Sequence, residues 1–231
     1  MRAIILAGGF GKRLRPLTDT LAKSMVPVAG KPVLVHQIEW LKGHGVDEFV
    51  LCVGHRKETI MDHFGDGARY GVTVRYVVED RPLGTAGAFR NAMATFPRDD
   101  PFFGLNGDVI TDLDPTSLLE RLRQTGAVAA IALVPLPSPY GEVITDDDGR
   151  VTSFVEKPRL MDHWINPGVY CLAPTIAAYL PEVGSIEYDV FPVLAQEGKL
   201  MACKHPDGLW VSIDSPKDVE EAAARLQGSP G

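Results

Sequence analysis

Cysteine is scarce in this chain of 231 residues, which has three cysteines and no Cys-x-x-Cys pair. Three widely spaced cysteines cannot form the disulfide framework of a small secreted domain, and their spacing does not match a zinc site. Cys52 and Cys171 lie in apolar runs, where a cysteine behaves as a small buried hydrophobe. We therefore expect a reducing compartment.

Long hydrophobic runs and an excess of positive charge are also missing. No stretch reaches the roughly 18 apolar residues of a membrane span. The apolar run at the N-terminus is too short for a signal peptide, because Gly8 and Gly9 end it. The net charge is -7, whereas sequence-independent binding of nucleic acid needs a surplus of Lys and Arg. We expect a cytoplasmic protein that binds neither nucleic acid nor a membrane.

Short apolar runs alternate with segments of helical periodicity in the first part of the chain. Strands are predicted at 4–7, 48–53, 72–78, 102–105 and 127–134. Helices are predicted around Leu34, Ile38 and Leu41, and at 57–64, 85–96 and 115–124. This alternation favours an α/β fold, a Rossmann-like three-layer sandwich with a mostly parallel sheet. Active sites of such sheets lie at the carboxyl ends of the strands.

The second part of the chain has a different pattern. Residues 142–155 predict a hairpin whose turn, Asp146-Asp147-Asp148-Gly149, we interpret as a solvated turn rather than a metal cluster. Further strands are expected at 165–172 and 200–213, and helices at 175–180, 190–196 and 217–226. This region forms a small lobe in the predicted fold.

The first strand leads into a glycine-rich loop, Gly8-Gly9-Phe10-Gly11-Lys12-Arg13. Glycines let backbone N–H groups turn toward a phosphate, and Lys12 and Arg13 add positive charge. The loop lacks the Gly-Lys-Ser/Thr of a Walker loop. It also has Leu14 where a dinucleotide fingerprint needs a third glycine. A nicotinamide dehydrogenase is therefore not favoured.

Other motifs follow the loop in a fixed order. Pro16-Leu17-Thr18 comes next, and then Lys23. With these residues the sequence resembles the sugar-1-phosphate nucleotidyltransferases, which open with Gly-Gly-x-Gly-x-Arg-Leu-x-Pro-Leu-Thr and a later lysine. The resemblance continues through Pro82-Leu83-Gly84-Thr85-Ala86-Gly87, Asn106-Gly107-Asp108, Glu156-Lys157-Pro158, Asn166-Pro167-Gly168 and an aspartate near the C-terminus. One departure is Ser24, where the family usually has proline.

The resemblance is strongest to mannose-1-phosphate and heptose-1-phosphate guanylyltransferases. The segments that carry it are 82–87, 184–187 and 190–192. It implies one catalytic domain over 1–231, with a nucleotide-binding half at 1–135, a sugar-binding half at 136–231 and no C-terminal β-helix domain. Dimerisation through the catalytic domain is compatible with this division, so a homodimer is an expectation.

The expected reaction transfers a nucleoside monophosphate from an NTP to a sugar 1-phosphate, with release of pyrophosphate. The attacking phosphate is already an anion, because its second pKa is about 6, so no catalytic Ser, Cys or His is required. Catalysis then consists of positioning and charge neutralisation. The resemblance implies catalytic roles for Arg13 at the triphosphate, Lys23 at the α-phosphate, Asp108 at a metal, and Lys157 at the sugar phosphate.

The expected cofactor is Mg²⁺, which prefers carboxylate oxygens. Asp108 supplies one carboxylate, at the end of an apolar strand. The second is assigned to Asp214, and Ser212 stays open as the alternative, because relatives differ in which of these positions carries the acid.

Glu79 bears on the choice of base. Guanine offers N1–H and N2–H donors, and a carboxylate accepts only, so Glu79 favours GTP over UTP or TTP. Cytidylyl-, uridylyl- and thymidylyltransferases remain alternatives within the family. A non-catalytic homologue that binds a nucleotide sugar and regulates a partner is a further alternative, although four charged catalytic positions argue against it.

The resemblance also implies two sets of binding residues. Those expected at the nucleotide are Leu6, Ala7, Gly8, Gly9, Gly11, Lys12, Arg13, Lys23, Glu79, Pro82, Gly84, Thr85, Asn106 and Gly107. Those expected at the sugar phosphate are Tyr140, Gly141, Glu156, Lys157, Asn166 and Gly168.

Overall fold

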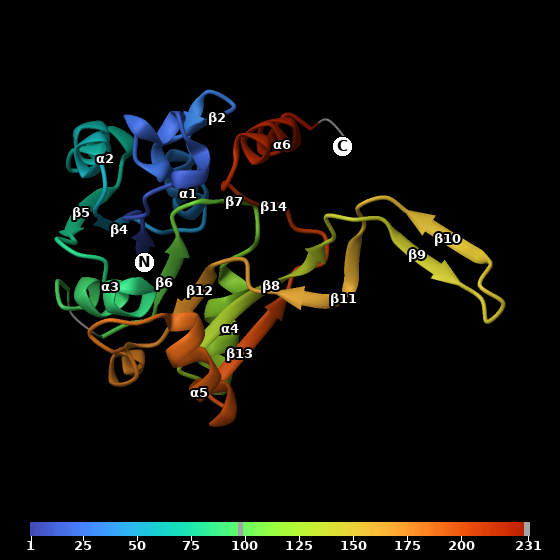
Figure 1. The fold of residues 1–231 in the computed structure, drawn as a ribbon. Helices are drawn as coiled ribbons and strands as arrows, with labels where there is room; N and C mark the ends of the chain where they lie inside the picture. Colours follow the sequence, from blue (N-terminus) through green and yellow to red (C-terminus); the bar gives the residue numbers. More distant parts are fainter. Residues whose placement is uncertain (97–98, 229–231) are drawn as a thin grey trace.

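The computed structural model describes residues 1–96 and 99–228, and these form an α/β fold around one eight-stranded sheet (Figure 1). The strand order is β11-β8-β12-β6-β1-β4-β5, and β13 pairs with β8. The strands of this sheet are β1 (Arg2–Leu6), β4 (Glu48–Val53), β5 (Thr73–Val78), β6 (Phe102–Asn106), β8 (Ala129–Pro137), β11 (Arg159–Ile165), β12 (Val169–Leu172) and β13 (Leu200–Lys204).

Most strands of the sheet run in one direction. The pairs β5–β4, β4–β1, β1–β6 and β13–β8 are parallel. β12 lies antiparallel between β6 and β8, and β11 is antiparallel to β8. The prediction of a mostly parallel sheet is confirmed, and the sheet itself joins the two halves of the chain.

Helices cover both faces of the sheet because its strands are apolar on both sides. In β1, Ala3 and Ile5 face the core under α1, α2 and α4, whereas Ile4 faces the core under α3 and α5. The three-layer sandwich is therefore confirmed. The helices are α1 (Val33–Gly43), α2 (Lys57–Phe64), α3 (Gly84–Met93), α4 (Thr116–Thr125), α5 (Phe191–Gln196) and α6 (Pro216–Leu226). None in the described ranges is long and apolar enough for a membrane span.

A small sheet outside the main one brings the C-terminal segment to the site. β7 (Val109–Thr111) pairs antiparallel with β14 (Trp210–Ser212). The backbone N–H of Ile213 then donates to the carbonyl of Asp108 at 2.8 Å. α6 starts directly afterwards with a capping box, in which Ser215 and Asp218 satisfy each other's backbone N–H groups. This cap fixes where the chain leaves Asp214.

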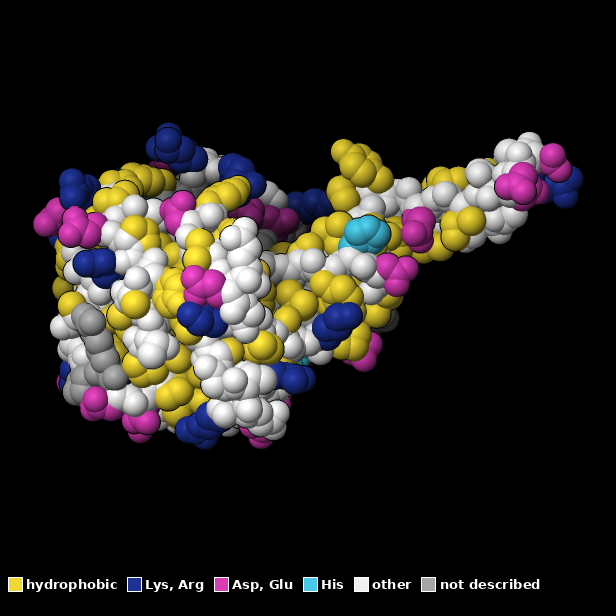
Figure 2. Space-filling model, turned by 90° about the horizontal axis from the view of Figure 1, so that it is seen from below, with side chains coloured by type: hydrophobic (Ala, Val, Ile, Leu, Met, Phe, Trp, Pro, Cys, Tyr) yellow, Lys and Arg dark blue, Asp and Glu magenta, His cyan; other side chains and the backbone are white. Residues whose placement is uncertain are grey.

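The predicted hairpin is an arm that projects from the body (Figures 1 and 2). It consists of β9 (Glu142–Thr145) and β10 (Val151–Val155). At its turn, Gly149 has φ 81°, and the Asp146 carboxylate accepts from the Arg150 N–H at 2.8 Å. The interpretation of this acidic stretch as a solvated turn is consistent with these contacts.

Several predicted elements are divided differently in the structure. The strand expected at 165–172 is broken, because Asn166 Oδ1 accepts from the Gly168 N–H at 2.9 Å and Gly168 has φ 78°. The strand expected at 200–213 is two strands, β13 and β14, in different sheets. The helix expected at 175–180 is a 3₁₀ helix (Pro174–Ala178), and a π-helical turn (Ile186–Val190) precedes α5.

Other short elements were not predicted. They are the 3₁₀ helices Lys12–Leu14, Leu17–Asp19, Lys23–Met25 and Ala68–Tyr70, and the two-residue strands β2 (Pro27–Val28) and β3 (Lys31–Pro32). The strands β7 and β11 were not predicted either. Cys52 and Cys171 are buried in β4 and β12 as expected, and all three cysteines are free thiols.

Candidate active site

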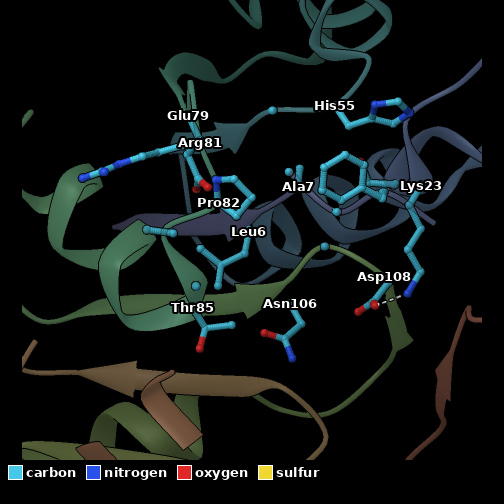
Figure 3. A pocket seen from close by; sticks show the side chains of 18 of the residues that line it. Leu6, Ala7, Lys23, His55, Glu79, Arg81, Pro82, Thr85, Asn106 and Asp108 are labelled. Atoms are coloured by element: carbon cyan, nitrogen blue, oxygen red, sulfur yellow. Dashed lines mark hydrogen bonds and ion pairs between the residues drawn. The ribbon is translucent and has the colours of Figure 1, made fainter. Parts of the chain in front are cut away.

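A cavity of about 560 Å³ opens at the carboxyl ends of β1, β4, β5 and β6 (Figure 3). The residues expected at the nucleotide that line it are Leu6, Ala7, Gly8, Gly9, Lys23, Glu79, Pro82, Gly84, Thr85, Asn106 and Gly107. These residues therefore lie together at the edge where α/β sheets bind ligands.

The same cavity has lining residues that the sequence argument missed: Phe10, Ser24, Gly54, His55, Asp80, Arg81 and Ala88. The Phe10 and His55 rings lie 5.1 Å apart, and they follow β1 and β4. Their position just after parallel strands was the available signal, since Phe10 stands at a variable position of the glycine loop and His55 belongs to no motif.

Gly11, expected at the nucleotide, packs the glycine loop against the segment that carries Lys23. A Cβ on Gly11 would lie 2.8 Å from Thr18 Cγ2 and 3.1 Å from Lys23 Cβ. The Thr18 hydroxyl donates to the Gly11 carbonyl at 2.8 Å. Lys12 and Arg13 follow on the exposed side, outside the cavity lining.

Lys23 lies at the centre of a charged cluster at the mouth of the cavity. Its ammonium donates to Asp108 Oδ2 (Figure 3). It also donates to Asp214 Oδ1 at 2.7 Å. The Lys23 side chain is only 15% exposed. Burial by itself lowers the pKa of Lys23, but the two carboxylates outweigh burial and raise it. The two partners therefore favour the cationic form of Lys23.

Arg13 completes this cluster from the exposed side. Its Nη2 lies 2.7 Å from Asp214 Oδ1, and its side chain is 76% exposed. Burial raises the pKa of Asp214, but hydrogen bonds from Lys23 and Ser212 and the charges of Lys23 and Arg13 lower it overall. Three of the four expected catalytic residues, Arg13, Lys23 and Asp108, therefore meet around Asp214.

The fit of this cluster to a divalent cation follows from its donors. Asp108 and Asp214 contact one ammonium, so their oxygens converge on a single position. Carboxylate oxygens are the donors that Mg²⁺ prefers. Ser212 donates to Asp214 Oδ2 at 3.0 Å, so Ser212 orients this carboxylate. In the described ranges no three acidic, histidine or cysteine side chains gather as a metal site, so Asp108 and Asp214 would hold a metal ion as a pair.

Glu79 enters the cavity on the side opposite Lys23 and Asp108 (Figure 3). Burial raises the pKa of Glu79, and the backbone N–H of Leu83 partly offsets the increase. The cavity thus has the cluster around Lys23 and Asp108 at one side. At the other side it has the Glu79 carboxylate, which can accept hydrogen bonds.

Asn166 and Gly168, expected at the sugar phosphate, lie beside the cavity. The Asn106 N–H donates to the Gly168 carbonyl at 3.0 Å, and a Cβ on Gly168 would lie 2.6 Å from Asn106 Nδ2. Asn166 Nδ2 donates to the Tyr170 hydroxyl at 3.0 Å. Asn106 Oδ1 is buried and has no partner. The structure therefore joins the motif at 166–168 to Asn106.

The other residues expected at the sugar phosphate lie at the base of the hairpin. A Cβ on Gly141 would lie 3.0 Å from Glu156 Oε2, and Lys157 Nζ is 3.8 Å from Glu156 Oε1. Tyr140 is 76% exposed, and Lys157 has φ 49°. Among the contacts of the described residues, none joins this group to the Lys23 cluster. The structure thus separates Lys157 from the other expected catalytic residues.

The site combines the glycine-rich loop, basic side chains and a pair of carboxylates. All of them lie at the carboxyl edge of a mostly parallel sheet. Backbone N–H groups of glycine loops bind phosphates, and carboxylates bind the metal ions that accompany phosphates. The fold and the cavity therefore define an α/β protein of the nucleotide-binding type.

The sequence profile described as "Nucleotidyl transferase" matches residues 2–229, and the chain belongs to that family. It is 36% identical to the UTP–glucose-1-phosphate uridylyltransferase of Synechocystis sp., over 96% of this chain and 62% of the relative. It is 39% identical to probable mannose-1-phosphate guanylyltransferase 2 of Oryza sativa, over 94% of this chain and 62% of that protein. The chain thus spans about 62% of the length of these two relatives.

A solved structure of the same fold is HddC from Yersinia pseudotuberculosis, complexed with GMP-PN. It superimposes with a TM-score of 0.75 at 29% identity and covers 97% of this chain and 99% of the solved chain. This agreement over both chains confirms the recognition of the family and of its α/β fold.

Proposed function

We propose that this chain transfers a nucleoside monophosphate from an NTP, with GTP preferred, to a sugar 1-phosphate of the mannose or heptose type. The products are an NDP-sugar and pyrophosphate. The observation that carries the proposal is the cluster in which Lys23 contacts both Asp108 and Asp214 beside the glycine loop. The mannose-1-phosphate guanylyltransferase relative and the GMP-PN complex of HddC support it.

The reaction needs no proton transfer from the enzyme. A phosphate oxygen of the sugar 1-phosphate forms a bond to the α-phosphorus of the NTP. The bond from the α-phosphorus to the oxygen that bridges to the β-phosphorus breaks, and its electron pair leaves with pyrophosphate. Negative charge gathers around the α-phosphate, so catalysis rests on cations and on orientation.

Each residue of the charged cluster has a task in this proposal. Lys23 contacts the α-phosphate, and Arg13, exposed at the rim, neutralises the departing pyrophosphate. Asp108 and Asp214 would hold Mg²⁺. The chemistry that the metal supplies when bound is neutralisation of phosphate charge.

The base and the sugar are bound on different sides of this cluster. Glu79 accepts hydrogen bonds from guanine N1–H and N2–H. Glu79 and Lys23 line opposite sides of the cavity, so ribose and phosphates would lie between them (Figure 3). Asn166, Gly168, Tyr140, Gly141 and Glu156 bind the sugar, and Lys157 binds its phosphate. Because Lys157 lies outside the cluster, the proposal requires the hairpin base to approach when the sugar phosphate binds.

A uridylyltransferase is the second candidate, and the 36% identity to the Synechocystis enzyme favours it. A panel of GTP, UTP, CTP and TTP against mannose, heptose and glucose 1-phosphates, with Mg²⁺ and measured as pyrophosphate release, separates the two. The proposal expects the highest kcat/KM with GTP. A higher kcat/KM with UTP or CTP would contradict the assignment of the base, and no release with any pair would favour a non-catalytic homologue.

The cytoplasm is the compartment that we propose, because NTP substrates and free thiols belong there. A homodimer stays a prediction, which sedimentation velocity of the purified chain measures.

A further inference from the structure

Gln37 is a buried polar side chain on the apolar face of α1. It is 2% exposed, and its helix neighbours Leu34, Ile38 and Leu41 belong to the core. Its position within an apolar helical pattern gave no reason to single it out from the sequence. In the structure its amide points out of the core toward the turn between β6 and β7.

The amide nitrogen of Gln37 spans that turn. Nε2 donates to the carbonyl of Asn106 at 2.8 Å and to the carbonyl of Val109 at 2.9 Å. Both hydrogens of the amide are therefore used, one on each side of Gly107 and Asp108. The amide oxygen Oε1 is buried without a partner. An unsatisfied buried acceptor is unfavourable, so the benefit of this glutamine lies in its two donors.

The rest of the turn is held by backbone groups. Gly107 N–H donates to the Leu6 carbonyl at 3.0 Å, and the Asp108 carbonyl accepts from Ile213 at 2.8 Å. A Cβ on Gly107 would lie 2.5 Å from the Leu6 carbonyl oxygen, so β1 presses directly on the turn. Among these contacts, Gln37 is the side chain that bonds to the backbone on both sides of the turn.

We propose that Gln37 is a positioning residue, which sets the Asp108 carboxylate toward Asp214 and Lys23 by clamping the carbonyls on both sides of it. This inference rests on the proposed function for its catalytic consequence, because Asp108 acts there as a metal ligand. The orientation of Asp108 by Gln37 does not depend on that function, because it concerns only the chain's own residues. Groups that orient metal ligands typically change metal affinity or activity by about 10–100-fold when they are removed.

The test is Gln37→Met, which keeps the length and volume of the side chain and removes both donors. Mn²⁺ binding, followed by electron paramagnetic resonance with Mn²⁺ alone as the probe, is expected to weaken about tenfold. With the best substrate pair, kcat is expected to fall about 10–100-fold, while the KM for the NTP changes less than about twofold. Hydrogen exchange at residues 106–109 is expected to quicken.

The matched control is Trp40→Phe. Trp40 lies one turn further along α1 and donates from Nε1 to the Leu113 carbonyl at 3.0 Å, beyond the turn that carries Asp108. Loss of this hydrogen bond is expected to lower the Tm about as much as Gln37→Met does, and to leave Mn²⁺ binding and kcat unchanged. A purely structural role for Gln37 predicts equal behaviour of the two variants, and that result would overturn the proposal.

A second variant covers poor folding of Gln37→Met. Gln37→His retains one N–H donor and is expected to lie between wild type and the methionine variant in both Mn²⁺ affinity and kcat. Wild-type values in a folded Gln37→His or Gln37→Met protein contradict the proposal. Absence of turnover in the wild type would refute the proposed function instead, and the Mn²⁺ titration would still test Gln37.

Discussion

Replacing Lys23 with methionine is predicted to have opposite effects on catalysis and on metal binding. Lys23 donates to both Asp108 and Asp214, so its ammonium occupies the position that a cation shared by both carboxylates must take. A metal ion held by both carboxylates would therefore displace the ammonium. Lys23 would then be free to contact the α-phosphate, as the proposed function requires.

The size of each effect follows from the burial of the pair. Hydrogen bonds to charged groups contribute about 1.5–3 kcal/mol each, but Asp108 and Asp214 are 27% and 28% exposed, which favours the lower end. Removing this competitor is expected to strengthen Mn²⁺ binding by about tenfold, equivalent to about 1.4 kcal/mol. Loss of a cation at the α-phosphate is expected to reduce kcat by about 10²–10³-fold.

The variant should also be less stable without metal. Two carboxylates then face each other without the ammonium, which is predicted to cost about 1–3 kcal/mol of unfolding free energy. Added Mg²⁺ should raise the Tm of Lys23→Met more than that of the wild type, because binding to the native state stabilises it. Differential scanning fluorimetry with and without Mg²⁺ measures this difference.

Lys12→Met is the matched control, since Lys12 is an exposed lysine of the same loop whose ammonium lies 5.9 Å from the Phe10 ring. Its Mn²⁺ affinity and its response to Mg²⁺ should equal those of the wild type. The reasoning is refuted if Lys23→Met binds Mn²⁺ with equal or lower affinity than the wild type, because displacement of the ammonium would then not accompany metal binding.

Three further predictions concern the other charged positions. Asp214→Asn should reduce Mg²⁺-dependent turnover at least about tenfold, because it removes a metal ligand and the partner of Lys23; near-normal turnover would assign the ligand elsewhere. Glu79→Gln should lower kcat/KM for GTP by about 10-fold, through loss of one acceptor for guanine. The ratio of kcat/KM for GTP to kcat/KM for UTP should fall accordingly. Burial raises the pKa of Glu79, so its carboxylate form exists above that raised value and is lost as pH falls through it. On acidification, the KM for GTP should therefore begin to rise at a pH above 4.5, the ordinary pKa of a glutamate. The Glu79→Gln variant should lack this rise, although the triphosphate of GTP titrates in the same way with both proteins. Lys157→Met should raise the KM for the sugar 1-phosphate by about tenfold and leave the KM for GTP unchanged, and equal changes in both constants would count against its assignment to the sugar phosphate.

Local patterns were sufficient for the elements that begin and end with local signals. The predicted strand 48–53 and helix 57–64 agree with β4 and α2, because apolar periodicity and the glycine at 65 are visible in sequence. The cavity residues were implied by the family resemblance, and their position at the ends of parallel strands agrees with the general rule for α/β sheets. The break in the strand at 166–168 was missed. It depends on one hydrogen bond, from the Gly168 N–H to the Asn166 side chain, and an apolar strand pattern does not reveal such a bond.

Contacts between distant segments could not be derived in this way. Asp214 reaches Asp108 only because β14 pairs with β7, and no local signal in either strand specifies that pairing. Gln37 was invisible for a similar reason. Its helix reads as an ordinary core helix, and its function depends on a turn about 70 residues later in the chain.

The glycines of this site have two separate physical reasons, and the structure distinguishes them. Gly8 and Gly9 line the cavity, and a Cβ on either would have no contact closer than 3.5 Å, so their benefit is access of a phosphate to the backbone. Gly84 has φ 71°, and a Cβ there would lie 2.2 Å from the Gly184 carbonyl oxygen. The Ala86 N–H donates to that same carbonyl at 3.0 Å, and Thr85 donates to Glu187 at 2.6 Å. The loop before α3 thus requires glycine because the segment at 184–187 packs directly on it. Two segments that are far apart in the sequence, 84–86 and 184–187, are held together there by backbone contact.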